Sequence, residues 1–136
     1  MTRPLSRGNP PVYFIDSEAD SLSNLALGVA NSMPDVSDLL LSEITRAKVQ
    51  APSRIAADVV TMHSTVEFVD EASGADRTVQ IVYPAQADIS AGRISILTPI
   101  AAGLIGLREG QSIEWPDRDG RTRTLTVVRV TQPTRI

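Results

Sequence analysis

The sequence predicts an α+β fold, in which a short N-terminal antiparallel helical hairpin precedes an antiparallel β-sheet domain with one short helix. Up to Ala47, apolar residues recur at spacings of three and four, which is the period of an amphipathic helix. Beyond Asp58 the chain is rich in β-branched residues that partly alternate with polar ones, which is typical of strands. We therefore expect a flexible segment over residues 1–12, the hairpin over 13–52 and the sheet domain over 53–136.

Two apolar stripes separated by a proline predict the hairpin. Asp16 and Asp35 are the expected N-cap residues of its two helices, and Pro34 separates them because proline disfavours a helical conformation in the residue before it. The first stripe comprises Leu22, Leu25, Ala26, Val29 and Met33, and the second comprises Val36, Leu39, Leu40, Glu43, Ile44 and Ala47. Two helices of about 15 residues joined by a tight turn form a hairpin about 22 Å long.

Five strands are predicted in the second part of the chain, where β-branched residues are bounded by turn residues. They span residues 59–68, 78–83, 93–97, 112–115 and 123–130. A turn at 71–76 joins the first two strands, and an Asp-Arg-Asp-Gly turn at 117–120 joins the last two. We expect these strands to form one antiparallel sheet.

A short helix is predicted between the third and fourth strands, over residues 99–106. Thr98 is a natural N-cap, and Pro99 suits the first helical position because an N–H there would have no partner within the helix. Gly103 is expected to let the helix lie close to the sheet, and Gly106 to end it in a left-handed conformation. Packing and chain reversal thus explain why proline and glycine occur within the apolar segment 94–115.

Composition restricts the classes of function. The 136 residues suit a single domain, and 42% hydrophobic residues is an ordinary globular content. A net charge of −3 argues against direct nucleic-acid binding, which depends on a basic surface. The absence of cysteine excludes disulfides, thiolate metal sites and thiol catalysis. No apolar stretch reaches the roughly 18 residues of a membrane span, and residues 1–14 lack the apolar core of a signal peptide, so we expect a cytoplasmic protein without a membrane partner.

Four segments follow one another in the second half of the chain: DVVTMHSTVEFVD, VYPAQAD, ISILTPIAAGLIGLREGQSIEW and LTVVRV. This ordered set resembles the C-terminal domain of the bacterial Gre transcription factors, and most closely the smaller Rnk group within that family. The resemblance runs from about Tyr13 to Val130. It implies an FKBP-like domain that docks at the rim of the RNA polymerase secondary channel, with an N-terminal coiled coil that reaches into the channel.

The resemblance also bears on catalysis. In the cleavage-stimulating members, acidic residues at the coiled-coil tip help to hold a catalytic Mg²⁺ that hydrolyses backtracked RNA. Rnk-like members have a much shorter coiled coil and bind polymerase without stimulating cleavage. The resemblance therefore implies a non-catalytic regulator without a cofactor, whose partner is RNA polymerase and which competes with Gre-type factors; we expect a monomer.

Leu97, Thr98, Pro99 and Ile100 are the candidate polymerase-binding residues, because they occupy the position of the Ser-Pro-apolar motif through which Gre domains contact the polymerase rim. Some cleavage factors carry an acidic residue where this chain has Leu97, so the contact expected there is apolar. A helix start alone also explains Thr98 and Pro99. The two interpretations are compatible, because a capped loop can present the adjacent surface.

Asp35 and Asp38 lie at the predicted hairpin turn, where an acidic tip pair would be. They could help to hold Mg²⁺, which prefers oxygen ligands, but two carboxylates alone fall short of a metal site. We favour helix capping, because both carboxylates suit a helix N-terminus. His63 is the only histidine, which excludes a His-pair metal site, and we expect it on the surface or on an edge strand.

Three alternative functions remain open. One is a transcript-cleavage cofactor that uses Asp35 and Asp38. A second is an adaptor acting on nucleotide metabolism, suggested by the full name of the Rnk group, regulator of nucleoside diphosphate kinase. The third is a prolyl isomerase, suggested by the fold alone; a catalytic FKBP site is lined with aromatic residues, which are only 4% of this chain.

Overall fold

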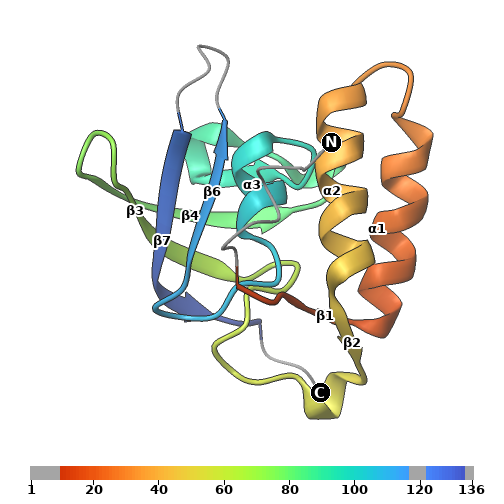
Figure 1. Ribbon diagram of the computed structural model, residues 1–136, viewed down its shortest axis with the longest axis horizontal. Coiled ribbons are helices and arrows are strands. Elements are labelled where there is room, and N and C mark those ends of the chain that lie inside the picture. Colours follow the sequence, from red (N-terminus) through yellow and green to blue (C-terminus); the bar gives the residue numbers. More distant parts are fainter. Residues whose placement is uncertain (1–9, 117–121, 134–136) are drawn as a thin grey trace.

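Two antiparallel helices lie beside a five-stranded mixed sheet in the computed structural model, which describes residues 10–116 and 122–133 (Figure 1). The helices are α1 (Asp16–Gly28), α2 (Pro34–Arg46) and the short α3 (Pro99–Leu104). The sheet has the order β5-β4-β3-β7-β6, from β3 (Thr65–Asp70), β4 (Ala75–Val82), β5 (Arg93–Ser95), β6 (Ser112–Pro116) and β7 (Thr122–Thr131). The predicted α+β fold, with the hairpin first and the sheet domain second, is confirmed.

The hairpin helices are shorter than predicted, and their N-cap residues differ from the prediction. α1 ends at Gly28, and the Met33 amide then donates to the Val29 carbonyl at 2.7 Å within the turn. Ile15 and Met33 are the N-caps, and neither makes a side-chain capping bond. Asp35 is not the cap because Pro34, with its preset φ, takes the first helical position and places the aspartate inside the helix.

Asp16 is likewise the first residue of α1 and not its cap. Its Oδ1 accepts from the amide of the next residue, Ser17, at 2.6 Å. A buried bond at the other end of the hairpin ties the two helices together, because the Ser37 hydroxyl donates to the Ala26 carbonyl at 2.8 Å. The turn end of the hairpin is therefore held closed.

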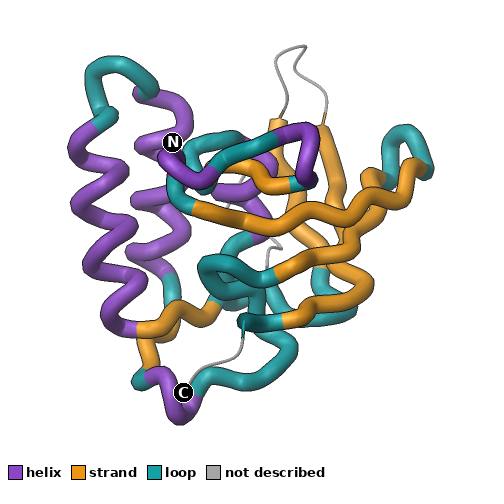
Figure 2. Tube along the Cα trace, turned by 180° about the vertical axis from the view of Figure 1, so that it is seen from behind, coloured by secondary structure: helices purple, strands orange, loops and turns teal. Residues whose placement is uncertain are grey.

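Two short parallel strands at the base of the hairpin were not predicted: β1 (Tyr13–Ile15) and β2 (Lys48–Gln50). Figure 2 shows them below the helices, at the end opposite the turn. Val12, expected in a flexible segment, is fully buried, and the Arg46 guanidinium donates to the Pro10 carbonyl at 2.6 Å. Strands of three residues are too short to show a two-residue period, which is why the sequence pattern missed them.

The strand predicted over residues 59–68 is wrong in its first half. Val60 donates to the Leu107 carbonyl at 2.8 Å outside the main sheet, and the strand begins only at Thr65. Between them the chain reverses: the Ser64 hydroxyl accepts from the Thr61 amide at 3.0 Å, and His63 has a φ of 68°. These β-branched residues are buried in the core without forming a strand. Their composition is typical of a strand, which is why the prediction was wrong here.

The sheet is mixed, whereas an antiparallel sheet was predicted. β5 pairs with β4 in parallel, and the other pairs are antiparallel. β3 and β4 pair as far as Asp70 and Ala75, so their turn is shorter than the predicted 71–76. The predicted turn at 117–120 lies outside the described residues. Residues 10–116 and 122–133 also contain three single-turn 3-10 helices: η2 (Pro52–Arg54), η3 (Pro84–Gln86) and η4 (Ile89–Ala91).

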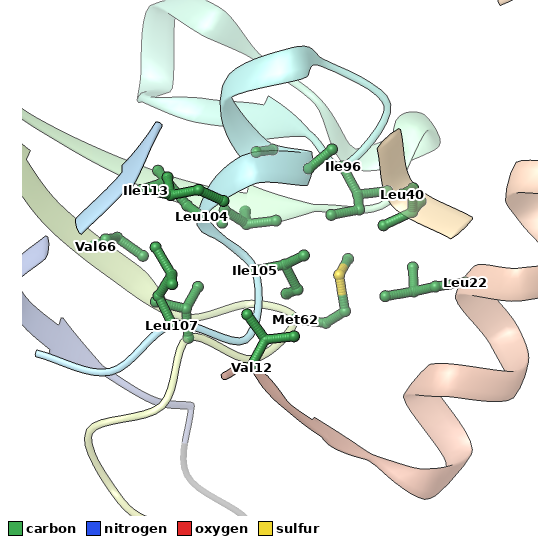
Figure 3. Close-up of a cluster of buried hydrophobic side chains, with 14 of the residues drawn as sticks. Val12, Leu22, Leu40, Met62, Val66, Ile96, Leu104, Ile105, Leu107 and Ile113 are labelled. Atoms are coloured by element: carbon green, nitrogen blue, oxygen red, sulfur yellow. The ribbon is translucent and has the colours of Figure 1, made fainter. Parts of the chain in front are cut away.

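One hydrophobic cluster joins the hairpin to the sheet domain. In Figure 3, Leu22 of α1 and Leu40 of α2 extend toward Met62 and Ile105 of the sheet domain, and all four side chains are buried. α2 also packs directly against α3. The hairpin therefore lies along the sheet domain and does not project from it as a free arm. In the described part of the chain, no helix is long and apolar enough to cross a membrane.

Candidate functional site

The start of α3 is a rigid corner held by two hydroxyl groups. The Thr98 hydroxyl accepts from the Ala101 amide at 3.4 Å and donates to the Ser95 carbonyl at 2.8 Å. The Ser95 hydroxyl in turn accepts from the Leu97 amide at 3.0 Å. Pro99 occupies the first helical position, so the predicted start of this helix is confirmed. The backbone of this corner is therefore fixed before any partner arrives.

The four predicted docking residues differ in accessibility. Pro99 is exposed, whereas Thr98 and Ile100 are half-buried, and Ile100 packs against the hydrophobic cluster. Leu97 is only 8% exposed and belongs to that cluster. An apolar contact through Leu97 was expected, but its side chain is not available to a partner in this structure. The accessible part of the predicted site comprises Thr98, Pro99 and Ile100.

A hollow of about 280 Å³ lies beside this corner. Phe68, Val79 and Ile94 of three neighbouring strands line it from the sheet, and Thr98, Pro99 and Ile100 line it from α3. Most of these side chains are apolar, so the hollow suits an apolar side chain of a partner. The sheet and the helix corner thus form one continuous candidate surface, which we call the α3 hollow.

Among the described residues that line the α3 hollow, Arg77 is the single charged one. It lies directly opposite Phe68 in the register of β3 and β4, and its side chain is exposed. Arg77 was not predicted to lie here, because the expected turn at 71–76 and the expected strand at 78–83 both leave it out. Pairing of Asp70 with Ala75 is what brings Arg77 opposite Phe68.

Asp35 and Asp38 both lie on the first turns of α2 and are exposed. Among the described residues, neither aspartate makes a side-chain hydrogen bond or an ion pair. No such bond connects them to the described residues of the α3 hollow either. No group of three or more His, Cys, Asp or Glu side chains among these residues could hold a metal ion. The pair is thus a feature of the hairpin surface, favourably placed at the positive end of the α2 dipole.

His63 lies in the turn before β3 and not within a strand. Its Nε2 is 2.9 Å from Oε1 of Gln86, and its ring centroid is 5.8 Å from that of Tyr83. It also lines a second, more polar hollow of about 540 Å³, together with Asp88 and Arg93. The Tyr83 hydroxyl lies 3.1 Å from the Ser21 hydroxyl of α1, so Tyr83 contributes to holding the hairpin against the sheet domain.

The structure is thus an α+β protein in which a helical hairpin packs beside a mixed sheet, with a capped short helix at the rim of the sheet. The chain belongs to the GreA/GreB family, because residues 55–132 match the family model described as transcription elongation factor, GreA/GreB, C-terminal. The matched residues include the whole main sheet and α3, and therefore the α3 hollow.

Individual relatives agree with this assignment. The regulator of nucleoside diphosphate kinase of Escherichia coli K12 is 33% identical over 121 residues, which cover 89% of each chain. The solved structure of a prokaryotic transcription elongation factor GreA/GreB from Nitrosomonas europaea is 37% identical, with a TM-score of 0.70 over 91% of this chain and 100% of that one. Transcription elongation factor GreA of Azorhizobium caulinodans is 41% identical over 91 residues, which are 67% of this chain but 57% of that protein.

Proposed function

We propose that this protein binds RNA polymerase at the entrance of the secondary channel, competes there with Gre-type factors and does not stimulate RNA cleavage. Two comparisons support the proposal. The sheet domain matches the GreA/GreB C-terminal family over residues 55–132, and a relative of similar extent is named regulator of nucleoside diphosphate kinase. The chain spans little more than half of the GreA relative.

The observation that carries the proposal is the exposed Pro99 on its fixed corner. Pro99 takes the proline position of the Ser-Pro-apolar motif, with Thr98 in place of the serine. Because Thr98 is bonded on both sides, docking costs little ordering of the backbone. The α3 hollow beside it offers an apolar surface of the kind that an anchor side chain of a partner fills.

The hairpin supports the non-cleaving part of the proposal. Each of its helices has 13 residues, which corresponds to about 20 Å of length. Leu39 and Leu40 of α2 are buried, so the helix is used to pack the core. A hairpin that lies along its own domain has little length left to extend into a channel.

Competition binding tests the proposal directly. Purified protein is titrated against RNA polymerase of the source organism, alone and with a Gre factor already bound. We expect saturable binding that the Gre factor displaces. Pro99→Asp should weaken binding roughly tenfold, which corresponds to about 1.4 kcal/mol. This variant keeps the Thr98 cap, and aspartate is favourable in the first turn of a helix, so its thermal melt should match that of the wild type.

A matched control is Val49→Asp, which adds the same charge at an exposed apolar residue of β2, at the base of the hairpin. It should bind polymerase as the wild type does. Equal loss of polymerase affinity in both variants would show a general effect of added charge and would count against docking through Pro99.

A pull-down from lysate separates the proposed function from that of an adaptor acting on nucleoside diphosphate kinase. The captured proteins are scored for polymerase subunits and for the kinase. Recovery of the kinase without polymerase would refute the proposal.

A further inference from the structure

Arg77 has an unusual place for a cation, on the core-facing side of the sheet. Alternate residues of a strand share a face, so Arg77 lies on the same face as Val79 and Ile81, both of which are buried. It is also opposite Phe68, which is 1% exposed. The apolar face of β4 thus ends in an arginine at the rim of the α3 hollow.

The Arg77 guanidinium makes no ion pair or side-chain hydrogen bond with the residues that the structure describes. By contrast, Arg46, Arg93 and Arg108 each pair with a carboxylate, at 2.7, 3.5 and 2.9 Å. The next acidic residue along the same sheet face is Asp70, which is buried and whose Oδ1 accepts from the Ala72 amide. The Arg77 charge is therefore available to a partner.

A partner that covers the α3 hollow also covers part of Arg77 and removes water from its charge. An uncompensated cation in such a contact costs binding free energy, whereas a paired one adds specificity and speeds association. The partner must then supply both an apolar side chain for the hollow and a carboxylate for its rim. Guanidinium and carboxylate form a bidentate pair, which would also set the orientation of the bound segment.

We infer that the α3 hollow binds an acidic amphipathic segment of the polymerase, with an apolar side chain against Val79 and Ile94 and a carboxylate paired with Arg77. This inference rests on the proposed function and names the chemistry of its contact. A nucleic-acid strand is the poorer occupant: one arginine is a small basic surface in a chain of net charge −3, and the buried Phe68 ring offers no face for a base.

Binding at several salt concentrations tests the inference with Arg77→Gln and Arg77→Glu. We expect Arg77→Gln to bind polymerase roughly tenfold more weakly at low salt, and Arg77→Glu more weakly still, because the charge is first removed and then reversed. The affinity of Arg77→Gln should also depend less on salt than that of the wild type, because salt screens the lost attraction. Thermal melts of both variants should remain close to the wild type, since Arg77 is exposed.

Arg54→Glu is the matched control, because Arg54 is an exposed arginine of η2, outside the α3 hollow. It should change affinity less than twofold, as expected of a charge outside the contact. Equal weakening of polymerase binding by Arg77→Glu and Arg54→Glu would show that the inference is wrong. So would Arg77 variants that bind polymerase as the wild type does while Pro99→Asp binds it weakly. In both cases the proposed function stands. If the wild type does not bind polymerase, the proposed function fails and the inference fails with it.

Discussion

A β-carbon placed on Gly106 would lie 2.8 Å from Cβ of Val12, a separation that Cβ atoms in folded proteins essentially never show. The Gly106 carbonyl also accepts from the Tyr13 amide at 3.0 Å, and its own amide donates to the Val60 carbonyl at 2.8 Å. Gly106 is therefore the point where the N-terminal strand β1, the buried segment before β3 and the end of α3 meet. No other residue type fits this junction without displacing β1.

Gly106→Ala should lower the free energy of unfolding by roughly 2 to 4 kcal/mol, because it combines a left-handed backbone with a steric clash. Gly110→Ala separates the two causes: Gly110 has a similar φ of 84°, but nothing lies near its missing side chain. It should cost only about 1 kcal/mol. Urea denaturation measures both values. Equal losses of unfolding free energy in the two variants would mean that Val12 and β1 move aside without destabilising the fold, contrary to the packing argument.

Arg46 ties α2 to the N-terminal segment and pairs with a buried carboxylate of its own helix. Its Nη2 donates to Oε1 of Glu43, which is 2% exposed, and its Nη1 donates to the Pro10 carbonyl. Arg46→Met should destabilise the fold by about 2 kcal/mol, because it leaves the Glu43 charge buried without its partner. Arg93→Met is the control, because its pair with Asp88 is far more exposed to solvent and should contribute less to stability than the Arg46 pair does. A smaller loss for Arg46→Met than for Arg93→Met would contradict this account.

Asp88 should titrate at lower pH than an ordinary aspartate. The Ser90 hydroxyl, which donates to its Oδ1 at 2.6 Å, is the main cause that holds the Asp88 pKa below its ordinary value, and Arg93 adds to the effect. A depressed pKa means that the charged form is favoured by folding. Its contribution to stability is therefore complete above the ordinary pKa and is lost as the pH falls through the folded value.

Carbon NMR of the Asp88 carboxyl group across the acidic range measures this pKa. Ser90→Ala should raise it toward the ordinary value, whereas Ser53→Ala, at an exposed serine of η2, should not change it. An unchanged titration in Ser90→Ala would show that the hydroxyl is not the cause.

Local chemistry predicted some elements well. The hairpin was recognisable because each 13-residue helix repeats its apolar spacing several times, and the start of α3 because Thr98 and Pro99 carry their own capping chemistry. The segment from Val59 to Ser64 was misassigned because burial selects the same β-branched residues in a packed turn as in a strand.

Elements that depend on distant partners could not be predicted in this way. The parallel pairing of β4 with β5 follows from two 3-10 turns between them that carry no strong sequence signal. The position of Arg77 depends on strand register, and an error of even one residue moves a side chain to the opposite face of the sheet. The candidate site was thus predicted on its α3 side, and its sheet side became visible only in the structure.

The last prediction concerns RNA cleavage. Asp35 and Asp38 lie at the turn end of a hairpin about 20 Å long, and the neighbouring Val36 and Ser37 are buried. If the α3 hollow docks at the channel rim, these carboxylates stop well short of a metal ion deep in the channel. Their attraction for it is also largely screened, because the Debye length is about 8 Å at physiological salt. The wild-type protein should therefore not stimulate cleavage in backtracked complexes.

The double variant Asp35→Asn and Asp38→Asn supplies the decisive comparison, because it keeps the size of both side chains and removes their charge. The double variant has no side-chain capping bond to lose. It should lower the free energy of unfolding by only about 0.5 kcal/mol per residue, because the favourable interaction of each carboxylate with the α2 dipole is removed. In the cleavage assay, wild type and double variant should behave alike, and both should suppress the cleavage caused by an added Gre factor as their concentration rises. Cleavage that the wild type stimulates and the double variant does not would show that the carboxylates reach the metal, and the non-cleaving part of the proposed function would then be wrong.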